Sequence, residues 1–236
     1  MASSIGLPSL ASLAHYAEFL LAGELSESIL YMRLPYLPVA DLRARFDAWR
    51  QLGLVTGPTD QMGASPELVP ILETILDARA QAAGELWSDA PSFVSASELV
   101  EGVLALIPAG FELATSHLRL PPPPDPHLRL HHRLTTIRYA RSQAHVRAWR
   151  SEGLDAEQAS SMTLMWRGGQ PEGSAGLDAL EARGLTEEGE LTLAGRRLRQ
   201  RIEEETNRSM RPVFELGDDH REGLLTALAG LPGEIH

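Results

Sequence analysis

Apolar side chains recur every three or four residues along most of the chain, the spacing that places them on one face of an α-helix. The periodic runs predict helices over residues 8–22, 26–34 and 39–52. A further run predicts a long helix from Ser65 towards Trp87, broken near Pro70. The intervening residues 56–64 lack this spacing and are rich in glycine, proline and polar residues, which predicts a hairpin.

The second half of the chain repeats this order of elements. Two glycines and one helix-starting hydroxyl residue fall at corresponding places in each half, within a few residues of spacing. Internal duplication is the simplest explanation. The aligned segments are residues 15–23 with 145–153, residues 46–54 with 177–185, and the helix starts at Ser65 and Thr192.

Three helices, a short hairpin and a long exit helix form the pattern of a winged-helix unit. We therefore expect a mainly α protein in which two winged-helix repeats are fused as a pseudo-dimer, with short β-hairpin wings. The expected divisions are a first repeat at 9–90, a helical insert and proline-rich connector at 91–126, a second repeat at 127–217, and a C-terminal helix or tail at 218–236.

Composition narrows the function classes. The chain has 236 residues, of which 43% are hydrophobic, so it can bury a real core. No apolar run approaches the roughly 18 residues of a membrane span, and the N-terminus lacks a basic secretory start. Cysteine is absent, which excludes disulfides and thiolate metal sites. No nucleotide-binding glycine loop or nucleophile elbow is present, so we expect a cytoplasmic protein without a cofactor.

Charge argues against DNA binding. The formal net charge is −11, and an acidic chain needs a concentrated basic face to approach phosphates. The first predicted wing has no basic residue, and the second carries Glu187, Glu188 and Glu190. These carboxylates would face the phosphates that a DNA-reading wing contacts.

Candidate chemistry concentrates between residues 127 and 150, which include no acidic residue. Arg138, Arg141, His145 and Trp149 are three or four residues apart and share one helical stripe. Guanidinium groups suit an anionic ligand, and imidazole can move a proton near neutral pH. His15 corresponds to His145 in the first repeat, so both could meet near the pseudo-dimer axis.

This pattern predicts a pocket for an anionic or polyketide-like metabolite. The acid–base candidates are His145 and His15, and the stripe supplies Arg138, Arg141 and the aromatic Trp149. Tyr16 and Tyr139 are additional hydrogen-bond donors beside these residues.

Each of these residues also has a structural interpretation. Either histidine could cap a helix, the arginines could pair with acids of the first half, and Trp149 could belong to the core. His127 and His131 have the spacing of a helical metal-binding pair, but no third potential ligand lies at a sequence spacing typical of metal sites. We therefore expect no metal site.

One segment runs Pro126-His-Leu-Arg-Leu-His-His-Arg-Leu-Thr-Thr-Ile-Arg138 and continues through Arg141 and His145-Val146. A second runs Leu191-Thr-Leu-Ala-Gly-Arg-Arg-Leu-Arg-Gln-Arg-Ile-Glu-Glu-Glu-Thr206. Both resemble the SalK-like duplicated helix-turn-helix family of actinobacteria. His132 matches the family pattern, and the resemblance implies that it lines or supports the site. Family members carry a Glu, a His and an Asp where this chain has Tyr139, Ala140 and Gln143.

Two functions from different classes follow. The favoured hypothesis is a small-molecule-binding protein, a cofactor-independent enzyme of natural-product metabolism, on a winged-helix scaffold that has lost DNA binding. Its chemistry would be cyclisation, isomerisation or hydrolysis by proton transfer and anion stabilisation. The alternative is a ligand-responsive transcriptional regulator, and a purely structural or partner-binding protein is a third option. The sequence leaves open whether a homodimer forms.

Overall fold

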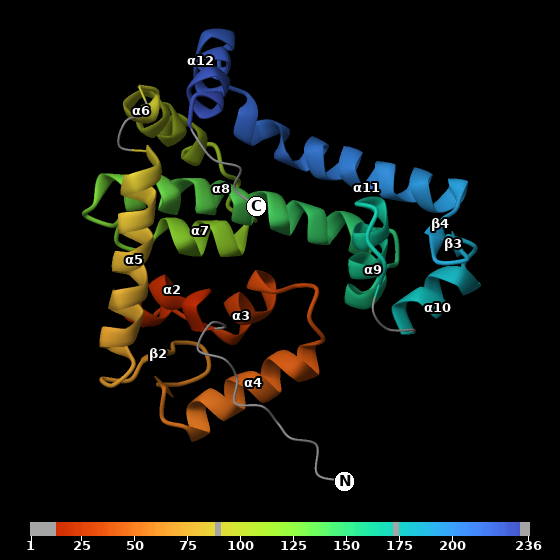
Figure 1. The fold of residues 1–236 in the computed structure, drawn as a ribbon, viewed down its shortest axis with the longest axis horizontal. Helices are drawn as coiled ribbons and strands as arrows, with labels where there is room; N and C mark the ends of the chain where they lie inside the picture. The colour runs from red at the N-terminus through yellow and green to blue at the C-terminus, as the bar shows by residue number, and fades with distance from the viewer. Residues whose placement is uncertain (1–12, 88–90, 172–174, 232–236) are drawn as a thin grey trace.

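The computed structural model describes residues 13–87, 91–171 and 175–231, and over these residues the chain is mostly helical with two short hairpins (Figure 1). The prediction of a mainly α protein with hairpins is confirmed. The elements are α2 (Ala17–Ala22), α3 (Glu27–Arg33), α4 (Val39–Gln51), β1 (Val55–Thr56), β2 (Gly63–Ala64), α5 (Val69–Trp87), α6 (Phe93–Leu104), α7 (Glu112–Leu118), α8 (Pro126–Ser151), α9 (Ala156–Trp166), α10 (Ala175–Ala182), β3 (Thr186–Glu187), β4 (Glu190–Leu191), α11 (Leu193–Met210), the 3-10 helix η1 (Arg211–Phe214) and α12 (Asp218–Ala229).

The first helical unit comprises α2 to α5 with the hairpin β1–β2. Gly23 ends α2 in the left-handed conformation at φ 67°, which a residue with a side chain rarely adopts. The Ser26 hydroxyl then accepts the Ile29 N–H and starts α3. Of the predicted first helix, residues 8–12 lie outside the described part, and the rest is interrupted by a turn at His15 and Tyr16.

The long helix of this unit starts later than the sequence predicts. Ser65 caps a turn over residues 65–68, accepting the Leu68 N–H, and the regular helix α5 begins at Val69. The Val69 N–H donates to the Ser65 carbonyl at 3.1 Å, whereas Pro70 has no N–H to donate to the carbonyl of residue 66, so this first turn lacks one helical hydrogen bond.

The second unit comprises the C-terminal part of α8, then α9, α10, the hairpin β3–β4 and α11. Asp155 and Gln158 form a capping box at the start of α9. Gly153 is left-handed at φ 71°, as Gly23 is in the first unit, and the Thr192 side chain caps α11. In the second hairpin Thr186 pairs with Leu191, and in the first Val55 pairs with Ala64.

Two hydrophobic cores meet along α8. The first core packs the first unit together with α6, α7, part of α12 and the N-terminal part of α8, which contributes Leu130, Tyr139 and Ala140. The second core holds the C-terminal end of α8 through Val146 and Trp149. Figure 1 shows α8 crossing the middle of the molecule, with the first unit beside one end and the second beside the other. The division of the chain near residue 126 stays a prediction.

Candidate functional site

A cavity of about 320 Å³ opens where α2, α3, α5 and α8 meet. We call it the arginine cavity, because guanidinium groups from three different helices reach it. Arg33 ends α3, Arg79 lies on α5 and Arg138 lies on α8. The lining residues are His15, Ala17, Glu18, Phe19, Arg33, Arg79, His131, Thr135, Arg138 and Tyr139.

The three arginines of the cavity are not neutralised by nearby acids. Within the described parts of the chain, no carboxylate oxygen lies within 4.0 Å of Arg33, Arg79 or Arg138. Arg79 donates to the Ala14 carbonyl at 2.8 Å, and the Arg33 guanidinium lies 5.0 Å from the centre of the Tyr139 ring. The buried Arg33 Nε has no hydrogen-bond partner. The cavity therefore has an excess of positive charge.

The titratable side chains of the cavity respond to this charge and to burial. Partial burial, together with Arg33, Arg79 and Arg138, lowers the pKa of His15, which favours the neutral imidazole at neutral pH. Burial is also the main reason that the pKa of His131 is lowered, and its buried Nδ1 has no hydrogen-bond partner.

Glu18 forms the inner wall of the cavity, where it contacts two buried histidines. Its Oε2 lies 2.5 Å from His117 Nε2 and 3.0 Å from His132 Nδ1. The two imidazole rings stack, with centroids 4.0 Å apart, and His117 Nδ1 lies 2.7 Å from Thr136 Oγ1. Burial opposes ionisation of Glu18, but the hydrogen bonds with His117 and His132 outweigh it and hold the pKa of Glu18 well below its usual range. We call Glu18, His117 and His132 the Glu18 cluster.

The structure places four of the predicted site residues in or beside the arginine cavity. His15, Arg138 and Tyr139 line it, and His132 lies behind Glu18. Two other predicted residues are buried elsewhere. The Tyr16 hydroxyl donates to the Leu30 carbonyl at 3.2 Å within the first core. Trp149, only 2% exposed, belongs to the second core, as its structural interpretation anticipated.

Arg141 and His145 lie instead between α8 and α11. Arg141 pairs with Glu203 at 2.8 Å, and His145 Nδ1 lies 3.1 Å from the Thr206 hydroxyl. Burial, followed by Arg199, lowers the pKa of His145 to about 4. His145 lies seven residues after Arg138, a rise of about 10 Å along a helix. The predicted helical stripe therefore starts at the arginine cavity and ends against α11. His15 and His145 therefore do not share a cavity.

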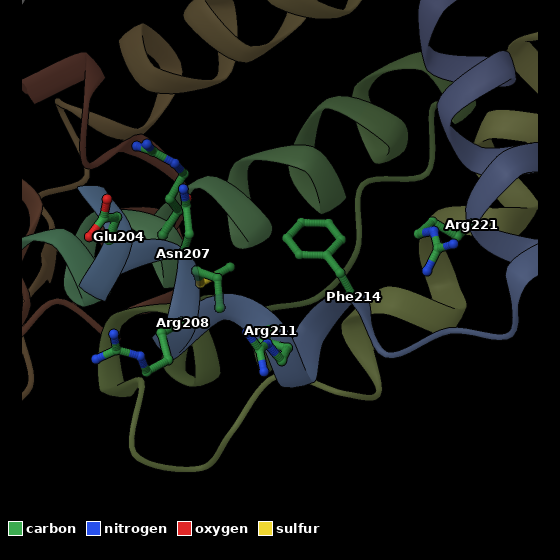
Figure 2. Close-up of a pocket in the computed structure, with 8 residues that line it drawn as sticks. Glu204, Asn207, Arg208, Arg211, Phe214 and Arg221 are labelled. Carbon is green, nitrogen blue, oxygen red and sulfur yellow. The ribbon is translucent and has the colours of Figure 1, made fainter. Parts of the chain in front are cut away.

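A second hollow, of about 730 Å³, lies along α11 and α12 (Figure 2). It is also rich in arginine, and Figure 2 shows the Phe214 ring between Asn207 and Arg221. Its guanidiniums mostly have partners, since Arg208 contacts Glu205 and Arg221 contacts Asp218 at 2.7 Å. This groove therefore has less unmatched charge than the arginine cavity.

The elements that would read DNA offer few unengaged cations. In α4, Arg43 pairs with Glu27 at 2.9 Å and Arg50 donates to the Gly57 carbonyl at 3.0 Å. Arg183, just after α10, donates to the backbone carbonyls of residues 152 and 153. Around the β3–β4 hairpin, Glu187, Glu188 and Glu190 are exposed. Phosphate contacts at these places would first have to displace existing interactions.

Several residues of the site could not be found from sequence spacing. Glu18 and His117 are 99 residues apart, and Arg33 and Arg79 come from separate helices. Only their packing against α8 brings them together. Local spacing identifies side chains that share one helix, which is why Arg138 was predicted, whereas Glu18, Arg33, Arg79 and His117 were missed. His132 was indicated by the family resemblance, and His15 by its correspondence with His145.

Comparison with known proteins adds one finding. A family model described as a helix-turn-helix family matches residues 58–235. The chain belongs to this helix-turn-helix family. No curated protein and no solved structure matches the chain.

The helix-turn-helix match covers α5 through α12 and therefore includes Arg79, His131 and Arg138 of the cavity. His15, Glu18 and Arg33 lie outside the matched range. The coarse expectation of a helix-turn-helix scaffold is confirmed, whereas the SalK-like resemblance stays a prediction. Among the described helices, none combines the length and apolarity needed to cross a membrane.

Proposed function

We propose that this helix-turn-helix protein binds a small anionic molecule in the arginine cavity. The observation that carries the proposal is the convergence of Arg33, Arg79 and Arg138 without a carboxylate within 4.0 Å among the described residues. Positive charges held close together repel one another, and an anion bound between them would offset this repulsion. Guanidinium groups also present several N–H donors in a fixed plane, which suits carboxylate, phenolate, enolate or phosphate oxygens.

The cavity also constrains the size and polarity of the ligand. A volume of about 320 Å³ is at the small end of ligand pockets, and most of the lining side chains are polar. Compact polar anions therefore fit better than a large polyketide. Glu18 gives one wall an acceptor, so a ligand with a hydroxyl or ammonium group opposite its anionic end would complement both walls.

Catalysis in this cavity would depend on His15. Its imidazole lines the cavity, and its lowered pKa favours the neutral form that accepts a proton from a bound substrate. The arginines would stabilise negative charge that develops on the substrate. This arrangement supports a cofactor-independent isomerisation, cyclisation or hydrolysis. His145 is not part of this proposal, because it lies against α11.

A ligand-responsive regulator is the second candidate, and membership of a helix-turn-helix family favours it. In this case the same cavity would hold the effector. The acidic β3–β4 hairpin and the engaged arginines of α4 argue against tight phosphate binding.

The matching order of elements and the left-handed Gly23 and Gly153 also support the duplication of the two units and their origin as a pseudo-dimer.

The test is a calorimetric titration of the full chain with a panel of phosphate esters, mono- and dicarboxylates and phenolates. Hydrogen bonds to charged groups contribute about 1.5–3 kcal/mol, so Arg138→Gln should weaken the best ligand roughly 10- to 150-fold. Arg141→Gln is the matched control, because Arg141 is also an exposed arginine of α8 but lies outside the cavity.

Equal affinity in wild type, Arg138→Gln and Arg33→Gln would refute the cavity as the binding site. Once a ligand is known, two measurements separate the two candidate functions. Conversion of the ligand that is lost in His15→Ala supports an enzyme. Binding to the chain's own upstream DNA that changes with the ligand and weakens steeply with salt supports a regulator.

A further inference from the structure

We infer that the Glu18 cluster is a binding site for one divalent transition-metal ion in the wall of the arginine cavity. Glu18, His117 and His132 each offer one ligand atom, and these atoms all lie within 4.8 Å of one another. Metal–nitrogen and metal–oxygen distances of about 2.0–2.2 Å place ligand atoms roughly 3–3.5 Å apart around one ion. The cluster therefore already gathers three ligand atoms near the separation that one ion requires.

The donor set indicates which ions fit. Two imidazole nitrogens and one carboxylate oxygen suit Zn²⁺, Fe²⁺, Co²⁺ or Mn²⁺, whereas Ca²⁺ and Mg²⁺ prefer oxygen ligands alone. The ligands come from three elements, α2, α7 and α8, which the first core fixes against one another. His117 and His132 are only 1% and 4% exposed, so their imidazoles are positioned by packing.

A second layer of contacts orients His117. The Thr136 hydroxyl donates to the His132 carbonyl at 3.1 Å, which leaves its oxygen free to accept a hydrogen bond from His117 Nδ1–H at 2.7 Å. Without an ion, Nε2 donates its proton to Glu18. A bound ion would replace that proton, and Nδ1 would keep its hydrogen bond to Thr136. Metal-bound histidines commonly donate their other ring N–H in this way. The rings of Phe19 and Tyr139 also pack against His117 and limit its rotation.

Ion binding requires a defined rearrangement. Without an ion, Glu18 Oε2 bridges both imidazoles directly, and the two ring planes lie 24° apart in a stack. An ion bound through a ring nitrogen lies close to the plane of that ring, so the stack must open and Glu18 must withdraw by about 1 Å to admit it. Glu18 can withdraw because it lines the arginine cavity and is partly exposed there.

Three protein ligands leave at least one coordination position open. The cavity is the side from which Glu18 is accessible, so water or a ligand anion would occupy this position. The metal site itself does not depend on the function proposed above. Only the contact between the ion and the bound anion rests on that proposal.

The test uses the full chain after treatment with a chelator, titrated with Zn²⁺ and separately with Co²⁺. We expect one ion per chain, and cobalt absorption bands typical of mixed nitrogen and oxygen ligands. Glu18→Gln keeps the size and hydrogen-bonding reach of the side chain but removes its charge, and should weaken binding at least 100-fold. Thr136→Val should weaken it roughly 10- to 100-fold, the range for loss of an orienting contact.

His127→Ala is the matched control, because His127 lies on α8 and forms a possible helical metal pair with His131. It should leave metal affinity unchanged. No binding of either ion, unchanged affinity in Glu18→Gln and His117→Ala, or loss of binding in His127→Ala would each overturn the inference. Should His117→Ala not fold, Glu18→Gln decides the question. Arg138→Gln should retain the ion, so failure of anion binding and failure of metal binding can be told apart.

Discussion

The buried His145 makes a quantitative prediction about stability and pH. Its side chain lies between α8 and α11, 3.1 Å from the Thr206 hydroxyl and 3.7 Å from a Glu203 oxygen. Burial and the guanidiniums of Arg199 and Arg141 favour the neutral ring, and Glu203 opposes them only in part. The pKa of about 4 in the folded chain compares with 6.5 for an unperturbed histidine.

The sign of the effect follows from this difference. Between pH 6.5 and 4 the unfolded chain binds a proton at His145 and the folded chain does not, so acid favours unfolding. The stabilisation is fully present above pH 6.5 and is lost as the pH falls towards 4. One pKa unit corresponds to about 1.4 kcal/mol, so the loss should approach about 3 kcal/mol.

Urea unfolding between pH 7.5 and 4 measures this loss, with His145→Gln as the perturbation. Glutamine does not titrate, so the free energy of unfolding of the variant should fall less steeply with acid, by up to about 3 kcal/mol over this range. Other groups titrate in both proteins, and the difference between the two curves isolates His145. Parallel curves would refute the assignment of a neutral, buried His145, and His220→Gln on α12 serves as the control.

Three further changes test the packing. Gly195→Ala should lower the free energy of unfolding by about 1–3 kcal/mol, because its Cβ would clash with the Leu185 carbonyl oxygen. Thermal unfolding measures this loss, and a variant as stable as wild type would contradict the close approach. Trp149→Ala should lower the free energy of unfolding, measured with urea, by about 3–5 kcal/mol, because the side chain is buried. A tryptophan that contacted a ligand would affect ligand binding more than stability. Arg141→Gln should change stability by less than about 1 kcal/mol, since the side chain is 53% exposed, and a larger loss would show that its pair with Glu203 is stronger than surface ion pairs usually are.

Local signals in the sequence predicted most of the elements. Gly23 and Gly153 end helices in the conformation that glycine favours, and the change from helical spacing to turn residues marks both hairpins. The start of α5 was predicted too early. The Ser65 hydroxyl accepts the Leu68 N–H and caps a turn, and the regular helix begins four residues later, at Val69 beside Pro70. Such boundaries depend on which few hydrogen bonds form, and the apolar pattern does not specify them.

Apart from His15, the predicted residues that lie at the cavity all belong to one helix. Arg138, Tyr139 and His132 belong to α8 and lie at or beside the cavity, whereas the pairing of Arg141 with Glu203 depends on how α11 packs. The expectation that His15 and His145 meet relied on their corresponding positions in two repeats. The structure places them against different neighbours, and this packing is a long-range property that residue spacing does not encode.

The position of α8 in both hydrophobic cores has a consequence for cooperativity. Its 26 residues contribute Leu130 and Tyr139 to one core and Val146 and Trp149 to the other. Separating the two helical units would expose part of the apolar surface of this helix, whichever unit kept it. The units should therefore melt as one cooperative block, with amide hydrogens of α8 among the slowest to exchange. A binding event that displaces α8 at one end would also reach α11 at the other, because both ends belong to the same helix.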